Sequence, residues 1–158
     1  MTRCRIHTSI GPFVLESDGK AVRRVFFGSE SAPFPEGAFD PVLERAAREI
    51  LEYLDGRRRR FEVPVRYPEG ATPFQRRVWD ALRRIPYGAV RTYGELAREL
   101  GTSPRAVGGA CARNPIPILV PCHRVVARDG LGGFAGQWET GLALEVKRRL
   151  LAVEGVIR

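Results

Sequence analysis

Cys122 is the residue whose surroundings most clearly indicate chemistry. It lies between Pro121 and His123 and follows the apolar run 116–120. Prolines in and around this run fix φ and remove backbone donors, which predicts an extended, rigid segment rather than a helix. A cysteine held there beside a histidine is a candidate nucleophile. A buried core cysteine is the alternative, and the residues alone leave both open, because sequence places no base within hydrogen-bond reach.

A nucleophilic Cys122 needs a base, because a free thiol with a pKa of about 8.5 is only slightly ionised at neutral pH. His123 is adjacent in sequence. Neighbouring side chains on an extended segment point apart, so a direct contact between sulfur and imidazole is harder to arrange than one through a bridging water. We therefore expect a water between the two side chains.

Glu154 and Asn114 each allow a structural or a functional interpretation. Glu154 follows a helix predicted over 141–153, where a carboxylate opposes the helix dipole. It is either exposed at the helix end or present for chemistry. Asn114 precedes Pro115 at the end of another predicted helix. Asparagine tolerates left-handed backbone and bonds its neighbouring backbone, so it serves as a helix cap or as a support for the segment that follows.

Composition points to a polyanionic partner. The chain of 158 residues has a formal charge of +8, and only two of its 26 basic residues, Lys20 and Lys147, are lysines. Three cysteines, no signal-type segment and no long apolar span indicate a cytoplasmic protein without a membrane segment. Cys4 and His7 have a plausible metal-ligand spacing, but two histidines do not complete a four-ligand set. We predict no metal and no cofactor.

The first 54 residues predict a small α/β unit. A glycine-containing turn over 17–20 joins two of the expected strands, and Asp40-Pro41 is typical of a helix start. Strands are expected over 3–10, 13–16 and 21–27, and a helix over 40–54. The expected apolar face of the helix consists of Val42, Leu43, Ala46, Ile50, Leu51 and Leu54.

Four consecutive arginines follow this helix. The run 57–60 precedes a predicted short strand over 61–65 and a Pro/Gly-containing linker over 67–71. It is either a solvated surface run or a patch that contacts phosphates. The linker predicts a domain boundary near residue 70, with domains over 1–70 and 71–158.

The second half predicts helices in quick succession. They are expected over 72–85, from residue 92 or 93 to 100, and over 105–113, with a tight glycine-containing turn between the last two. Such a pair in a basic chain is typical of a helix-turn-helix motif. Gly108 and Gly109 lie inside the second helix of the pair and cost about 1 kcal/mol each relative to alanine. They allow a close approach, either of DNA or of a neighbouring helix.

Three sequence blocks in order resemble the O6-alkylguanine-DNA alkyltransferase family. They are R-A-V-G-G-A at 105–110 with N-P-x-P-I at 114–118, P-C-H-R-V-V at 121–126, and L-L-A-V-E-G at 150–155. The resemblance covers roughly residues 72–155. It implies a ribonuclease-H-like α/β domain followed by a mostly helical, winged helix-turn-helix-like domain.

The same resemblance implies direct repair of DNA. An alkyl group passes irreversibly from O6-alkylguanine, flipped out of the duplex, to Cys122, and each molecule acts once. The expected partner is double-stranded DNA bound through its minor groove, and the protein is expected to be a monomer that associates with the nucleoid. No metal or cofactor is implied.

The resemblance also assigns roles to individual residues. His123 and Glu154 form a relay with Cys122, Asn114 supports the active-site turn, and Tyr93 protonates the leaving guanine. Residues expected to contact DNA are Tyr93, Ser103, Arg105, Ala106, Gly109 and Ala110, with Arg105 filling the gap left by the flipped base. Expected pocket walls are Pro117, Val125, Phe134 and Ala135, where relatives commonly carry tyrosine and serine at the last two positions.

Three other functional classes remain as alternatives. A non-catalytic lesion binder of the alkyltransferase-like kind lacks the cysteine that this chain carries. A cysteine hydrolase with a Cys–His–Glu set turns over, whereas the repair reaction stops after one event. A transcription factor with the same helix-turn-helix shows a strong sequence preference, which a smooth minor-groove helix does not.

Overall fold

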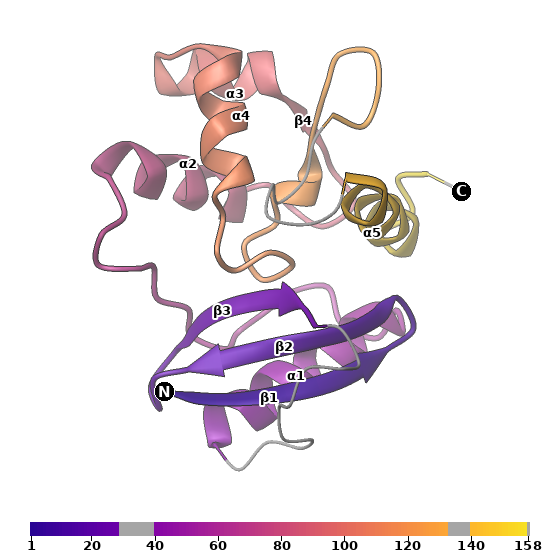
Figure 1. The fold of residues 1–158 in the computed structure, drawn as a ribbon. Coiled ribbons are helices and arrows are strands. Elements are labelled where there is room, and N and C mark those ends of the chain that lie inside the picture. Colours follow the sequence, from indigo (N-terminus) through magenta and orange to yellow (C-terminus); the bar gives the residue numbers. More distant parts are fainter. Residues whose placement is uncertain (29–39, 133–139, 158) are drawn as a thin grey trace.

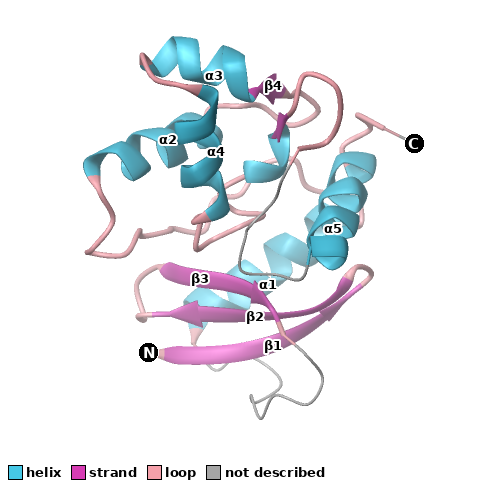
Figure 2. Cartoon of the chain, turned by 45° about the horizontal axis from the view of Figure 1, so that its top comes forward, coloured by secondary structure: helices cyan, strands magenta, loops and turns pink. Residues whose placement is uncertain are grey.

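The first half of the chain is a three-stranded antiparallel sheet with one helix packed against it. The computed structural model describes residues 1–28, 40–132 and 140–157. The strands β1 (Thr2–Thr8), β2 (Gly11–Ser17) and β3 (Val22–Phe27) pair in the order β1-β2-β3. Asp18 closes the second turn, because its Oδ1 accepts hydrogen bonds from the N–H groups of Lys20 and Ala21. Figure 2 shows α1 (Pro41–Leu54) lying against this sheet.

The helix α1 begins at the predicted cap. The Asp40 carboxylate accepts from the Val42 N–H at 2.7 Å and from the Ser17 hydroxyl at 3.0 Å, which ties the helix to the sheet. Its buried face differs in part from the prediction. Leu51 is 41% exposed, and Tyr53 is fully buried in the core.

Residues 61–65 do not form the predicted strand. Among the described residues, this stretch has only an isolated bridge between Val22 and Val65. The N–H groups of Glu62 and Val63 donate instead to the buried Glu49 carboxylate, at 2.8 and 3.0 Å. A side chain of α1 therefore satisfies the backbone donors that a strand partner would have satisfied.

The second half is mostly helical, and capping residues set its helix starts. Thr72 and Thr92 each form a capping box, and Ser103 caps through its hydroxyl. Gly101, with φ of 68°, ends the first helix of the expected helix-turn-helix. The helices are α2 (Pro73–Arg83), α3 (Tyr93–Leu100), α4 (Pro104–Ala112) and α5 (Thr140–Val153), and the two-residue strands β4 (Arg91–Thr92) and β5 (Val125–Val126) pair in parallel.

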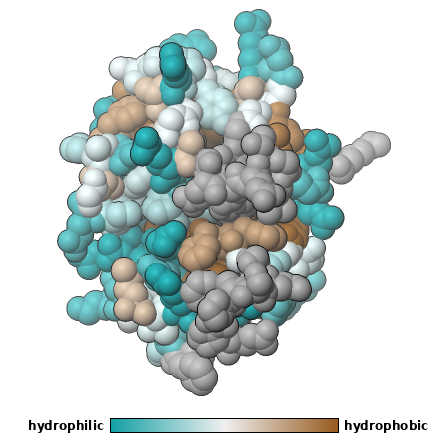
Figure 3. All heavy atoms as spheres, in the orientation of Figure 1, coloured by the Kyte–Doolittle hydropathy of each residue, from teal (hydrophilic) through white to brown (hydrophobic). Residues whose placement is uncertain are grey.

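One hydrophobic core extends through both halves. The cluster includes Phe13 and Leu43 from the first half and Val78, Ile116 and Leu150 from the second. The Val25 N–H of β3 donates to the Pro115 carbonyl at 3.0 Å, so the sheet also holds the segment that follows α4. Figure 3 shows a largely hydrophilic face with an apolar patch near its middle. A sheet unit followed by a helical unit confirms the predicted α/β and helical halves.

Candidate functional site

The segment that leads to Cys122 is a compact turn and not the extended rod predicted from its prolines. The Val120 N–H donates to the Ile116 carbonyl at 2.9 Å, and Ile118 has a φ of 76°. A β-branched residue in the left-handed region is strained, so its surroundings must hold it there. Proline fixes φ only at its own position, which is why three prolines still allowed a turn between them.

Asn114 holds this turn closed from one side. Its Oδ1 accepts from the Ile116 N–H at 3.0 Å, and its Nδ2 donates to the Val120 carbonyl at 2.8 Å. The side chain is fully buried. Replacing the amide would leave two buried backbone groups without their partners, next to the residue that leads into Cys122.

Cys122 opens a short 3-10 helix, η1 (Cys122–Arg124), and is only 1% exposed. The other two cysteines are also buried. Burial, followed by the charge of Cys122, raises the pKa of the Cys111 thiol far above its usual range, and burial raises that of Cys4 to about 11. Both remain protonated at neutral pH. Burial therefore does not distinguish Cys122 from the others; its neighbours do.

His123 and Glu154 form the buried pair that the sequence left undecided. The His123 Nε2 lies 2.6 Å from Glu154 Oε2, and both side chains are fully buried. Burial opposes ionisation of Glu154, but hydrogen bonds from His123 and Arg124 outweigh it and hold the pKa of the carboxyl at about 2. Burial lowers the pKa of His123, so its imidazole is neutral at neutral pH. With Nε2–H donating to the carboxylate, the lone pair lies on Nδ1, which has no hydrogen-bond partner among the described residues.

Three groups that we did not predict complete the environment of Glu154. The Arg124 Nε donates to both carboxylate oxygens, at 2.9 and 3.1 Å, and the Gly88 N–H donates to Oε1 at 2.9 Å. The third group comes from the first half of the chain: the Tyr53 hydroxyl donates to Oε2 at 2.5 Å and lies 3.3 Å from the His123 Nε2. The Glu154 carboxylate at the end of α5 therefore accepts hydrogen bonds from distant segments of the chain, although the helix dipole disfavours a negative charge there.

Lys147 is a further residue that sequence reasoning missed. It lies on α5 with a fully buried side chain, and its Nζ donates to the Val125 carbonyl at 2.7 Å. Nζ also lies 5.7 Å from the centroid of the Tyr93 ring. Burial lowers its pKa to about 8, while the thiols of Cys122 and Cys111 act in the opposite direction. An ammonium that interacts with these sulfurs favours their thiolate form.

Replacing Lys147 by methionine is expected to change how stability depends on pH. The pKa falls from 10.5 to about 8 on folding, so between these values the unfolded chain holds a proton that the folded chain has lost. Wild-type stability should therefore rise through this window relative to Lys147→Met, by up to about 3 kcal/mol. Urea unfolding across the window measures the difference. The free energy of unfolding of Lys20→Met, at the other lysine, should depend on pH as that of wild type does. If the curve of Lys147→Met is also parallel to wild type, the lowered pKa of Lys147 is contradicted.

The face of α4 that carries Arg105 and Gly109 is open. Both residues are exposed, and Ala106 is half-buried. A Cβ atom added at Gly108 or Gly109 would meet nothing within 4 Å, so these glycines do not serve to pack α4 against a neighbouring helix within the described part of the chain.

One residue of the expected DNA-contacting face is buried on another side of α4. Ala110 is 4% exposed, and its carbonyl accepts from the Trp79 Nε1–H at 2.9 Å. It packs α4 onto α2 and is not available to a ligand at the open face. The helical period places residues 105 and 109 on one side and residue 110 about a third of a turn away, which the uniformly small side chains of this stretch concealed.

Tyr93 begins α3 beside a pocket of about 510 Å³. The pocket is also lined by Pro104 at the start of α4 and by Ala127 and Arg128 after β5. Of the expected walls of the guanine pocket, Pro117 and Val125 are buried near Cys122 in sequence. Phe134 and Ala135 lie outside the described residues.

The described residues contain no group of three or more histidine, cysteine or acidic side chains that would hold an ion. Cys4 is buried on β1, whereas His7 is exposed, because residues three apart on a strand face opposite sides. In the same part of the chain, no helix is long and apolar enough to cross a membrane.

Known proteins match this chain over both of its halves. The family described as 6-O-methylguanine DNA methyltransferase, DNA binding domain, matches residues 73–156. The methylated-DNA–protein-cysteine methyltransferase of Archaeoglobus fulgidus is 41% identical over 143 residues, which cover 90% of this chain and 91% of the relative. The constitutive enzyme of that name from Bacillus subtilis is 35% identical, over 94% of this chain and 92% of the relative.

Solved structures extend the similarity to the fold. The crystal structure of Mycobacterium tuberculosis OGT in complex with DNA superposes with a TM-score of 0.81 at 35% identity, covering 98% of this chain and 92% of that one. The matched class is that of DNA-binding alkyl-transfer proteins of DNA repair. The chain belongs to the methylated-DNA–protein-cysteine methyltransferase family, and it is an enzyme of that class. The resemblance stated from the sequence blocks is confirmed.

Proposed function

We propose that the protein reverses O6-alkylguanine damage directly, by moving the alkyl group from the base to the sulfur of Cys122. The observation that carries this is the buried His123–Glu154 pair, in which His123 lies on the same short turn as Cys122 and its Nδ1 has no partner among the described residues. A neutral imidazole fixed in this tautomer can act as a general base that accepts a proton at Nδ1.

Thiolate formation follows from this arrangement. A water between Cys122 and His123 passes the thiol proton to Nδ1, and the resulting imidazolium is stabilised by the Glu154 carboxylate at 2.6 Å. Lys147 adds a positive charge that favours the thiolate. Arg124 and Tyr53 are positioning residues, because their hydrogen bonds hold Glu154 and not the substrate.

The transfer itself is a displacement at the alkyl carbon. The sulfur forms a bond to that carbon as the bond from carbon to the guanine O6 breaks. The guanine then leaves as a neutral base after taking a proton from the Tyr93 hydroxyl, which solvent restores. The thioether on Cys122 cannot be hydrolysed back, so each molecule acts once and needs no metal or cofactor.

DNA binds at the open face of α4, and this helix enters the minor groove of the DNA. The two glycines with free space beside them suit a narrow groove, and Arg105 at the start of α4 fills the gap left by the flipped base. Extrusion costs a few kcal/mol and is least costly for a damaged base, which is itself selective. The guanine then lies against Tyr93, beside Pro117 and Val125.

This proposal takes the second half as a winged helix-turn-helix-like domain over 71–158 and the first as a ribonuclease-H-like domain over 1–70. The β4–β5 pair beside α3 supports the winged helix-turn-helix-like assignment of the second half. The protein acts as a monomer on DNA in the cytoplasm, and three free cysteines fit a reducing compartment.

Transfer stoichiometry tests the proposal. With excess duplex carrying radiolabelled O6-methylguanine, the label on protein should rise in one burst and stop at one methyl group per molecule. Continued release of product beyond that amount would identify a hydrolase instead. Binding without any label on the protein would identify a lesion binder.

A further inference from the structure

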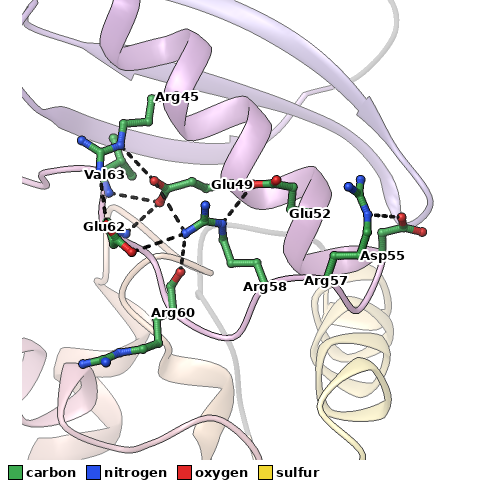
Figure 4. Close-up of polar contacts among 9 residues, drawn as sticks. All are labelled: Arg45, Glu49, Glu52, Asp55, Arg57, Arg58, Arg60, Glu62 and Val63. Carbon is green, nitrogen blue, oxygen red and sulfur yellow. Dashed lines mark hydrogen bonds and ion pairs between the residues drawn. The ribbon is translucent and has the colours of Figure 1, made fainter.

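The four-arginine run after α1 divides into two functionally different pairs. Arg57 binds Asp55 at 2.7 Å, and Arg58 binds Glu52 at 3.1 Å. Figure 4 shows Arg58 inside this group of carboxylates, while the Arg60 side chain points away from it. Within the described residues, neither Arg59 nor Arg60 forms an ion pair with a carboxylate. Carboxylates therefore neutralise Arg57 and Arg58, whereas Arg59 and Arg60 have no such partner within the described residues.

The two remaining arginines line a cleft with two more from the other half of the chain. Arg59, Arg60, Arg83 and Arg84 surround a space of about 500 Å³ between the segment after α1 and the end of α2. The described lining includes no acidic residue. Arg124 also lines the cleft, but Glu154 neutralises it. Four exposed arginine residues thus line one concave space, and its described walls carry no acidic residue.

One wall of the cleft holds Arg59 in place. The Arg59 guanidinium lies 5.4 Å from the centroid of the Tyr87 ring, a cation–π geometry. Tyr87 is fixed in turn, because its hydroxyl donates to the Val153 carbonyl at 2.9 Å. A concave surface lined by one sign of charge concentrates the opposite ion, and the planar guanidinium fork matches phosphate oxygens in pairs.

We propose that this arginine cleft binds phosphate-bearing anions and is separate from the DNA-contacting face of α4. None of Ser103, Arg105 and Gly109 lines it. In Figure 1, the start of α4 lies beside α3 at the end of the helical half that is farther from the sheet, whereas the cleft is formed where the two halves meet. The phosphate belongs either to the backbone of a nucleic acid or to a free polyphosphate.

Calorimetric titration of the full chain with sodium tripolyphosphate, at constant ionic strength in chloride, tests the proposal. We expect one saturable site. Arg59→Gln with Arg60→Gln, and separately Arg83→Gln with Arg84→Gln, should each weaken binding by about tenfold or more, because each pair removes charge-assisted hydrogen bonds from one wall. The control pair Arg48→Gln with Arg57→Gln removes the same charge outside the cleft and should change affinity by less than about twofold.

A short oligothymidylate distinguishes the two sources of phosphate. If it displaces tripolyphosphate and its own binding weakens in both cleft variants, the site takes a nucleic acid backbone. If its binding is the same in cleft variants and wild type, the site takes a free polyphosphate. Absence of saturable tripolyphosphate binding to wild type would overturn the proposal, as would equal weakening in the cleft variants and the control pair.

Discussion

Replacing Cys122 by alanine is expected to abolish alkyl transfer and to leave recognition of the lesion intact. The substitution removes the only atom that forms the new bond, whereas the open face of α4 and Arg105 are unchanged. Single-turnover assays with an O6-methylguanine duplex should therefore give no label on protein. A gel-shift titration should give an affinity within a few-fold of wild type.

Cys111→Ala is the matched control for this loss. Cys111 is buried like Cys122, and burial raises the pKa of its thiol well above the usual range, so we do not expect it to accept the alkyl group. This variant should transfer the alkyl group at a rate within a few-fold of wild type. Residual transfer by Cys122→Ala, or complete loss in Cys111→Ala with a folded protein, would contradict the assignment.

Replacing Glu154 by glutamine is expected to damage both stability and rate. The carboxylate neutralises Arg124 and receives hydrogen bonds from Tyr53 and His123, all of them buried. Removing one partner of a buried charge pair costs about 3–5 kcal/mol. Loss of the group that stabilises the imidazolium should also slow transfer by about 10²–10⁴-fold. Chemical denaturation and single-turnover kinetics measure the two effects.

Glu145→Gln on the same helix is the control. Its carboxylate pairs with Arg149 at 3.1 Å on an exposed surface, so its loss should cost less than about 1 kcal/mol and leave the rate unchanged. If Glu154→Gln behaves like Glu145→Gln, the buried network does not support the nucleophile. The control also separates a general effect of charge on α5 from a specific effect at the site.

Local signals were sufficient to predict the helix starts. Asp40, Thr72 and Ser103 each cap the helix expected after them, because a capping side chain acts within three residues of its own position. The strand predicted over 61–65 was wrong for the opposite reason. Its apolar residues suit a strand, but the partner for its backbone is the Glu49 side chain, which only the packed fold brings there.

The candidate site was predicted where a family motif marks it and missed where only the fold assembles it. Cys122 and Glu154 lie in sequence blocks that resemble known relatives. Tyr53 lies 70 residues from His123, in a half of the chain that offered no motif, and reaches the site only because α1 packs beside it. Lys147 reads as an ordinary surface residue of α5 until its burial beside Val125 is seen.

The turn before Cys122 shows the limit of reasoning from residue type. Prolines predicted an extended segment, but proline fixes φ only at its own position and does not specify the direction of the chain between the prolines. Ile118 in the left-handed region, held by Asn114, reverses the chain so that η1 follows directly. No residue preference predicts a β-branched side chain at positive φ, because the local energy opposes it and only the surrounding contacts compensate.

Peptide mass spectrometry after incubation with a duplex containing O6-methylguanine addresses the central claim most directly. We predict one added methyl mass on the peptide that contains Cys122, with the Cys4 and Cys111 peptides unchanged. A methyl group found on Cys111, or consumption of the lesion with no adduct on the protein, would contradict the proposal that the sulfur beside the His123–Glu154 pair accepts the alkyl group.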